Sequence, residues 1–219
     1  MLCMAATVPQ LWAQTYTVAG SDAQALGTTW DPGNTSNNMT LYSGNMYYLL
    51  KTVTYSSNTN AEYKITVNNN WTVSYGANGG SGNASYSVNS GTGYVCFAFN
   101  SSTSSHVPHM VSSLQNVIVT GSDTQALGVS WEHTNTSNKM STNDGITYTL
   151  VRNVDYTAAA NDLQCKVCVN GSDYYGTSTG GNVYYNIPSA GAYTVTYNFN
   201  AVTGILTVDV QSAAPVIPN

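Results

Sequence analysis

One stretch of the sequence, residues 62–76, combines the residue types that can capture a sugar. It begins as a run in which apolar and polar side chains alternate, and then carries three asparagines and a tryptophan. A sugar ring has an apolar face that an aromatic ring can cover, and a rim of hydroxyls that amides and ammonium groups can bind. We expect Lys64 on the outer face of a strand and Trp71 in the polar loop that follows, so both are candidate sugar-binding residues.

Each of these residues also has a structural interpretation. The alternative for Lys64 is a solvated lysine on a strand, and the alternative for Trp71 is a ring that anchors its loop. Trp30 stands in the pattern Leu-Gly-x-x-Trp, which suits a sugar contact and a plug in the core equally well.

Catalytic chemistry has little support in the sequence. The chain has ten carboxylates and three histidines, but no nucleophile elbow, zinc-protease motif or pair of acids. Asp22 and Asp123 both follow Gly-Ser, where an aspartate typically caps a turn. His106 and His109 flank Pro108 in an expected strand, and we expect neither to bind a metal. The sequence therefore predicts no enzyme activity, no metal and no cofactor.

Two of the four cysteines have the Cys-x-x-Cys spacing of some zinc sites. Residues i and i+3 of a strand face opposite sides, however, so Cys165 and Cys168 cannot share a metal there. We expect Cys165 inside the core and Cys168 outside. Cys3 lies in an expected leader, and the three cysteines that remain cannot form a complete set of disulfides.

The chain consists of two copies of one module. Gly-Ser-Asp, Gln-Ala-Leu-Gly and a tryptophan at residues 20–30 return in the same order at 121–131. Expected strands are short, rich in Thr, Val and Tyr, and broken by Gly, Asn and Ser, without a helical period: 46–53, 84–88 and 94–100, then 146–154, 183–187 and 193–200. This pattern predicts an all-β fold of two tandem Ig-like β-sandwich modules.

We expect four segments in the chain: a partial signal peptide at 1–14, module 1 at 15–111, module 2 at 117–211, and a linker or tail at 212–219. Residues 1–13 are apolar and uncharged, and are too short to span a bilayer. We interpret them as the distal part of a signal peptide, against the alternative of a disordered or buried N-terminus. The sequence thus predicts a secreted or outer-surface protein without a membrane-spanning segment.

The composition limits the classes of partner that the chain is expected to bind. Charged residues make up 7% of the chain, and its net charge is -5 with scattered Lys and Arg. Nucleic-acid binding needs clustered positive charge, so nucleic acid is not an expected partner.

The order of motifs resembles a known group of modules. It is similar to the accessory (X25-like) β-sandwich modules of pullulanases, to the starch-binding repeats of Bacteroidetes SusE/SusF-type outer-membrane proteins and, more distantly, to the glycogen-binding module of AMP-activated kinase β subunits. The residues that carry this resemblance are Leu26 to Trp30, Met39, Tyr63 to Ile65, Asn68 to Trp71, Tyr75, Gly76 and Gly79 to Asn83. The resemblance covers nearly all of both copies.

In the glycogen-binding relatives, two tryptophans, a strand lysine and an asparagine contact the glucan. The resemblance therefore implies Trp30, Lys64, Trp71 and Asn83 in module 1, and Trp131, Lys166 and Asn182 in module 2. The second copy lacks a counterpart of Trp71, and Tyr174 is the candidate to replace it.

Three functions remain open at this point. The first is a non-catalytic pair of modules that binds α-glucan, a polysaccharide of the starch or glycogen type. The second is a set of Ig-like spacer repeats in a surface adhesin or stalk. The third is the N-terminal accessory region of a larger glycoside hydrolase, with further domains downstream.

Overall fold

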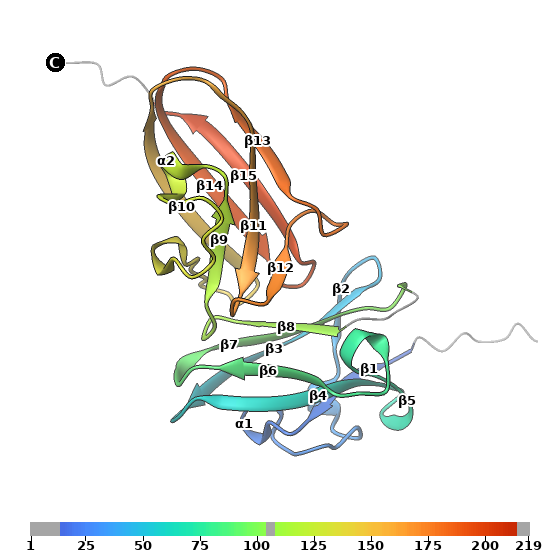
Figure 1. The fold of residues 1–219 in the computed structure, drawn as a ribbon. Helices are drawn as coiled ribbons and strands as arrows, with labels where there is room; N and C mark the ends of the chain where they lie inside the picture. Colours follow the sequence, from blue (N-terminus) through green and yellow to red (C-terminus); the bar gives the residue numbers. More distant parts are fainter. Residues whose placement is uncertain (1–13, 104–107, 214–219) are drawn as a thin grey trace, which may run out of the picture.

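The computed structural model describes residues 14–103 and 108–213, and its regular secondary structure consists mostly of antiparallel strands. These strands form four sheets, two in each half of the chain (Figure 1). The expected all-β fold is confirmed. Most of the expected leader, part of the expected tail and His106 lie outside the described residues.

Module 1 contains two sheets, which we name after their central strands. In the β4 sheet, β4 (Thr59–Val67) pairs with three strands: β1 (Tyr16–Gly20), β5 (Asn70–Tyr75) and β6 (Ala84–Val88). The β7 sheet runs in the order β2 (Thr40–Ser43), β3 (Met46–Tyr55), β7 (Gly91–Asn100) and β8 (Pro108–Ser112).

Module 2 repeats this arrangement. In the β11 sheet, β11 (Ala160–Val169) pairs with three strands: β9 (Val117–Gly121), β12 (Asp173–Tyr175) and β13 (Val183–Ile187). The β14 sheet runs in the order β10 (Thr147–Tyr156), β14 (Gly191–Asn200) and β15 (Ile205–Ser212).

The alternation of side chains builds the core of each module. In β4, Tyr63, Ile65 and Val67 are buried and point toward the β7 sheet, where Phe97 and Phe99 meet them in one hydrophobic cluster. Full burial of such a side chain contributes about 1.5–3 kcal/mol to stability. The residues between them on β4, including Lys64, therefore face away from this core.

A buried aspartate closes the end of each sandwich. The Asp22 carboxylate caps α1 (Ala23–Leu26), accepting hydrogen bonds from the amides of Gln24 and Ala25. It also accepts hydrogen bonds from the hydroxyls of Tyr55 and Tyr86, which come from the two different sheets. The expected turn-capping role is confirmed, and the tyrosine contacts add a tie between the sheets.

Asp123 repeats this arrangement in module 2. It caps α2 (Thr124–Leu127) and accepts hydrogen bonds from the hydroxyls of Tyr156 and Tyr185. The tie is thus a property of the module and not of one copy.

Two local expectations differ from the structure. Trp71 lies on strand β5 and not in a loop, because Asn68 and Asn69 both take φ of +56° and turn the chain into a hairpin. Cys168 is buried and not exposed, with 1% of its surface accessible. The segment around Lys139, which bridges to Ile118, and the neighbouring Tyr174 cover this part of the outer face of the β11 sheet.

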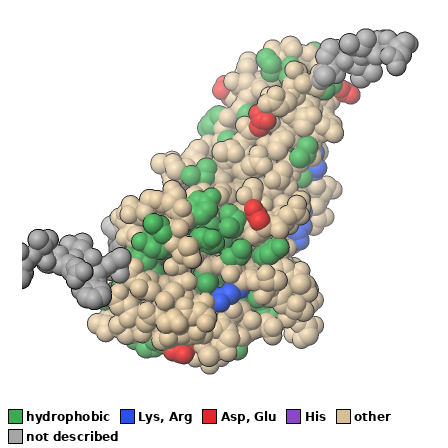
Figure 2. All heavy atoms as spheres, turned by 180° about the vertical axis from the view of Figure 1, so that it is seen from behind, with side chains coloured by type: hydrophobic (Ala, Val, Ile, Leu, Met, Phe, Trp, Pro, Cys, Tyr) green, Lys and Arg blue, Asp and Glu red, His purple; other side chains and the backbone are tan. Residues whose placement is uncertain are grey.

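The two modules share hydrophobic surface. Cys96, Ala98 and Val111, on the outer face of the β7 sheet, belong to the same buried cluster as the core of module 2. Strand β8 lies at the junction (Figure 1), and from behind, hydrophobic side chains gather beside the waist between the modules (Figure 2). The Tyr94 hydroxyl donates to the Asn143 carbonyl at 3.0 Å across this junction, and Asn200 Nδ2 donates to the Tyr42 hydroxyl at 2.8 Å.

Candidate carbohydrate-binding surface

Two tryptophans of module 1 form a pair at the β4 sheet. The ring centroids of Trp30 and Trp71 lie 6.2 Å apart, with 43° between the ring planes. Trp71 is 43% exposed and Trp30 is half-buried. Trp30 comes from the loop after α1, whereas Trp71 comes from a bulged part of β5, where the pairing with β4 shifts between Thr66 and Val67. Residues far apart in sequence are thus brought into one aromatic surface.

The backbone of Trp30 is held in a conformation that L-residues avoid. Its φ is +51°, and its amide donates a hydrogen bond of 2.7 Å to the Gly20 carbonyl at the end of β1. Trp131 repeats both features, with φ of +53° and a 2.7 Å bond to Gly121. A left-handed conformation costs a non-glycine residue about 1–2 kcal/mol, and such strain is concentrated at functional sites.

Polar side chains of β4 and of the start of β6 lie on the same outer face. Lys64 is half-buried and pairs with Ala19 of β1. Glu62 is two residues before Lys64, on the same side of the strand, and its Oε2 accepts a hydrogen bond of 2.9 Å from Asn83 Nδ2. The structure therefore brings Lys64 and Asn83 to one face and adds Glu62, which sequence reasoning missed although its i−2 spacing from Lys64 indicated it.

Module 2 preserves the polar part of this surface. Lys166 lies on β11 in the register of Lys64, and Asn182 Nδ2 donates to Gln164 Oε1 at 2.7 Å, as Asn83 does to Glu62. Trp131 is 41% exposed. Both copies thus have a tryptophan in the same strained backbone position and an asparagine amide that bonds to the strand residue two positions before the lysine.

Tyr174 lies on the outer face but in a different register from Trp71. It pairs with Cys168, as Ser74 pairs with Thr66 in module 1, so the bulge that carries Trp71 has no counterpart here. Tyr174 is 45% exposed, and its ring meets His133 edge-on at 6.1 Å. A hydrogen bond with the Cys168 thiol raises the pKa of Tyr174, so its hydroxyl is neutral at ordinary pH.

A further aromatic residue on the β11 sheet was missed from the sequence. Tyr184 of β13 is 61% exposed and pairs with Gln164. Its neighbours Val183 and Tyr185 point toward the core, so the alternation of this short strand already indicated an outward tyrosine.

The described residues show neither a cluster of metal ligands nor a membrane-spanning helix. No group of three or more His, Cys, Asp or Glu side chains within residues 14–103 and 108–213 is placed to hold a metal ion. His109 Nε2 donates to the Ala201 carbonyl at 2.8 Å, and burial lowers the pKa of its imidazole. Among the described helices, none is long and apolar enough to cross a membrane.

Comparison with known proteins gives one family match. No curated protein matches the sequence. Among solved structures, a pullulanase from Bacillus acidopullulyticus matches with a TM-score of 0.36 and 15% sequence identity, over 91% of this chain and 28% of that chain. This chain thus spans about a quarter of the length of that pullulanase. The family model of the pullulanase X25 domain matches residues 15–106, so the part of the chain that carries the Trp30–Trp71 pair is similar to this domain.

Proposed function

We propose that the chain is a non-catalytic pair of carbohydrate-binding modules that binds α-glucan of the starch or glycogen type. The observation that carries this proposal is the Trp30–Trp71 pair, an exposed aromatic surface with rings 6.2 Å apart. The fold would be more stable if both tryptophans were buried in relaxed backbone conformations than with one ring exposed and the backbone of the other strained. Their placement therefore favours a ligand over a role in packing.

Sugar rings would lie with their apolar faces against Trp30 and Trp71. The hydroxyls at the rim would meet the Lys64 ammonium, the Glu62 carboxylate and the Asn83 amide, whose orientation is fixed by the bond to Glu62. A shallow site of this kind yields only a few kcal/mol, which corresponds to a dissociation constant of about 1 mM to about 100 μM.

Module 2 is the weaker of the two sites in this proposal. Trp131, Lys166 and Asn182 repeat the arrangement of module 1, and Tyr174 and Tyr184 supply aromatic surface in place of Trp71. Two linked sites on one polymer gain avidity when both can be occupied together.

The similarity of module 1 to the pullulanase X25 domain supports a carbohydrate ligand and an extracellular setting. It also favours an arrangement in which these modules are the accessory region of a longer hydrolase. The apolar residues 1–13 support export, as the end of a signal peptide. In this arrangement the modules hold the polymer, and any hydrolysis takes place in another domain.

The test is affinity electrophoresis in gels that contain starch. We expect Trp71→Ala to lose most of the retention and the double variant Trp30→Ala/Trp71→Ala to lose it all. Val151→Ala is the control, because Val151 is similarly exposed at 49% but lies on β10, in a sheet that carries neither proposed surface. Calorimetry with maltoheptaose, cello- and xylo-oligosaccharides then defines the glycan.

Unchanged retention of the double variant would show that the tryptophan pair is not the site. If the unmodified protein binds none of these glycans, the modules act as structural spacers.

A further inference from the structure

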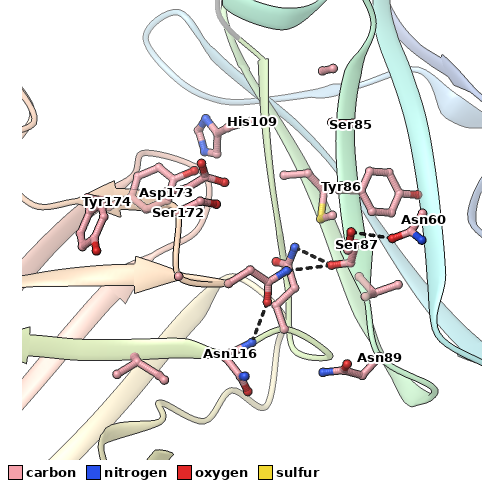
Figure 3. A pocket seen from close by; sticks show the side chains of 18 of the residues that line it. Asn60, Ser85, Tyr86, Ser87, Asn89, His109, Asn116, Ser172, Asp173 and Tyr174 are labelled. Atoms are coloured by element: carbon pink, nitrogen blue, oxygen red, sulfur yellow. Dashed lines mark hydrogen bonds between the residues drawn. The ribbon is translucent and has the colours of Figure 1, made fainter. Parts of the chain in front are cut away.

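A cleft of about 1130 Å³ lies between the two modules. One wall is β6 of module 1 with the neighbouring Asn60, and the other is the turn between β11 and β12 of module 2 (Figure 3). The cleft is separate from the Trp30–Trp71 pair, which lies at the other end of the β4 sheet.

The walls of the cleft are fixed relative to one another. The carbonyl of Ser87 accepts hydrogen bonds from Asn170 Nδ2 at 2.9 Å and from Gln115 Nε2 at 3.1 Å, so β6 is tied to the β11–β12 turn and to the segment between the modules. Behind the cleft, His109 binds the Ala201 carbonyl, and the shared hydrophobic cluster covers the outer face of the β7 sheet. A preformed cleft binds a ligand without the cost of ordering its walls.

The lining is neutral and suited to hydroxyls. Module 1 contributes Asn60, Ser85 and Ser87, and in Figure 3 the Ser87 hydroxyl donates to Asn60 Oδ1, a bond of 2.6 Å. Module 2 contributes three rings, those of Tyr174, Tyr175 and His133. Of the lining residues in the described chain, Asp173 alone bears a formal charge. Amides and hydroxyls on one wall and aromatic rings on the other suit a neutral polyhydroxylated ligand.

Strand register connects this cleft to the proposed site of module 1. Lys64, Glu62 and Asn60 follow one another along the outer face of β4, a distance of about 13 Å at about 3.3 Å per residue. Ser85 pairs with Glu62 and Ser87 pairs with Asn60, so β6 widens the same row of polar groups. One polar track therefore leads from Lys64 and Asn83 to the cleft.

We propose that a single α-glucan chain binds along this track, from the tryptophan pair of module 1 into the cleft and against Tyr174 of module 2. The inference rests on the proposed function and adds how the two modules share the ligand. One glucan chain contacts both modules, and the cleft is a binding site of its own. The ligand class is a linear neutral oligosaccharide long enough to leave module 1.

Calorimetry with a short and a long oligosaccharide tests this on the full chain. We expect one maltoheptaose to bind per protein, about tenfold more tightly than maltotriose. Two cleft variants should remove this advantage: Tyr174→Ala, which deletes the ring, and Ser87→Arg, which fills the cleft from an exposed position. Both should leave maltotriose binding at the tryptophan pair unchanged, whereas Trp71→Ala should weaken both ligands.

The controls are Val151→Ala, for loss of an exposed apolar side chain, and Thr157→Arg, for an added arginine at an exposed position; both residues lie outside the cleft lining. Two maltoheptaose molecules per protein, with affinity unaltered by both cleft variants, would overturn the inference while leaving the proposed function intact. If Trp71→Ala leaves both ligands bound as before, the proposed site of module 1 fails instead.

Discussion

At Trp30 the module gives up stability in the backbone and places a half-buried ring beside Trp71. Its φ of +51° is a conformation that glycine adopts freely, and its counterpart Trp131 has the same conformation. The amide bond to Gly20 fixes the backbone there and leaves the ring beside Trp71. If packing were the only requirement, a glycine or asparagine would meet the backbone geometry at lower cost.

Two substitutions of Trp30 separate the ring from the backbone. Trp30→Gly and Trp30→Ala remove the same ring, so both should lose the same share of glucan affinity. The glycine variant should be more stable than the alanine variant by about 1 kcal/mol, because only glycine relieves the positive φ. Urea unfolding of the two variants measures this difference. An alanine variant as stable as the glycine variant would contradict the strain at this position.

At the scale of elements, the hydrogen bonds from tyrosines of both sheets to Asp22 and Asp123 determine how stability changes at alkaline pH. Burial, followed by the hydrogen bond to the Asp22 carboxylate, raises the pKa of Tyr55 and of Tyr86. The same causes, with Asp123 as the acceptor, raise the pKa of Tyr156 in module 2. A tyrosinate at any of these positions would be buried beside a carboxylate.

We therefore predict that the free energy of unfolding falls steeply above pH 10. The folded-state pKa of these tyrosines lies above the ordinary value of 10.0, so the folded chain retains protons that the unfolded chain releases. Their contribution is complete below pH 10 and is lost as the pH rises, by up to about 1.4 kcal/mol per pH unit for each tyrosine. Urea unfolding between about pH 8 and about pH 11.5 measures this slope. Tyr55→Phe should reduce the slope, and an unchanged slope in that variant would contradict the assignment.

The sequence predicts elements better than it predicts what covers them. The strands of residues 84–88 and 183–187 are observed as expected, since alternation and turn residues are local signals. Cys168 was placed wrongly because burial on the outer face depends on a segment around Lys139 that is distant in sequence. Similarly, nothing local indicated that Asp22 would bind tyrosines more than thirty residues away.

In the candidate site, too, local signals were predictable and contacts between distant segments were not. Lys64 and Asn83 were found by motif, and their common face follows from strand alternation. The contact between Trp30 and Trp71 was beyond prediction, since it depends on a hairpin turn and a bulge whose positions the sequence does not specify on its own. The cleft between the modules depends on their docking, and the motifs that indicated Lys64 and Asn83 carry no information about it.

At the scale of the whole molecule, one sheet face differs between the copies. The register of β3 with β7 and of β10 with β14 aligns the outward positions of the two modules. In module 1 these positions are apolar and are covered by module 2: Cys96, Ala98 and Val111. The corresponding positions of module 2 are polar: Thr196, Asn198 and Asp209. This contrast is readable in the sequence once the copies are aligned, and it explains why docking occurs on this face of module 1.

Val111→Asp should therefore separate the modules without unfolding either one. The substitution gives module 1 the side chain that module 2 has at Asp209, which is exposed, and an unpaired carboxylate cannot stay in the shared cluster. Cys96 reports the result, because it is fully buried at the junction and its burial raises the pKa of the thiol to about 12. We expect Cys96 to react with thiol reagents in this variant, identified by peptide mapping, while Cys165 and Cys168 stay protected inside module 2. The control Asp209→Val makes the reverse exchange on the uncovered face and should leave Cys96 protected. An unreactive Cys96 in Val111→Asp would show that the hydrogen bonds at Ser87 and Ala201, and not the apolar face, hold the modules together.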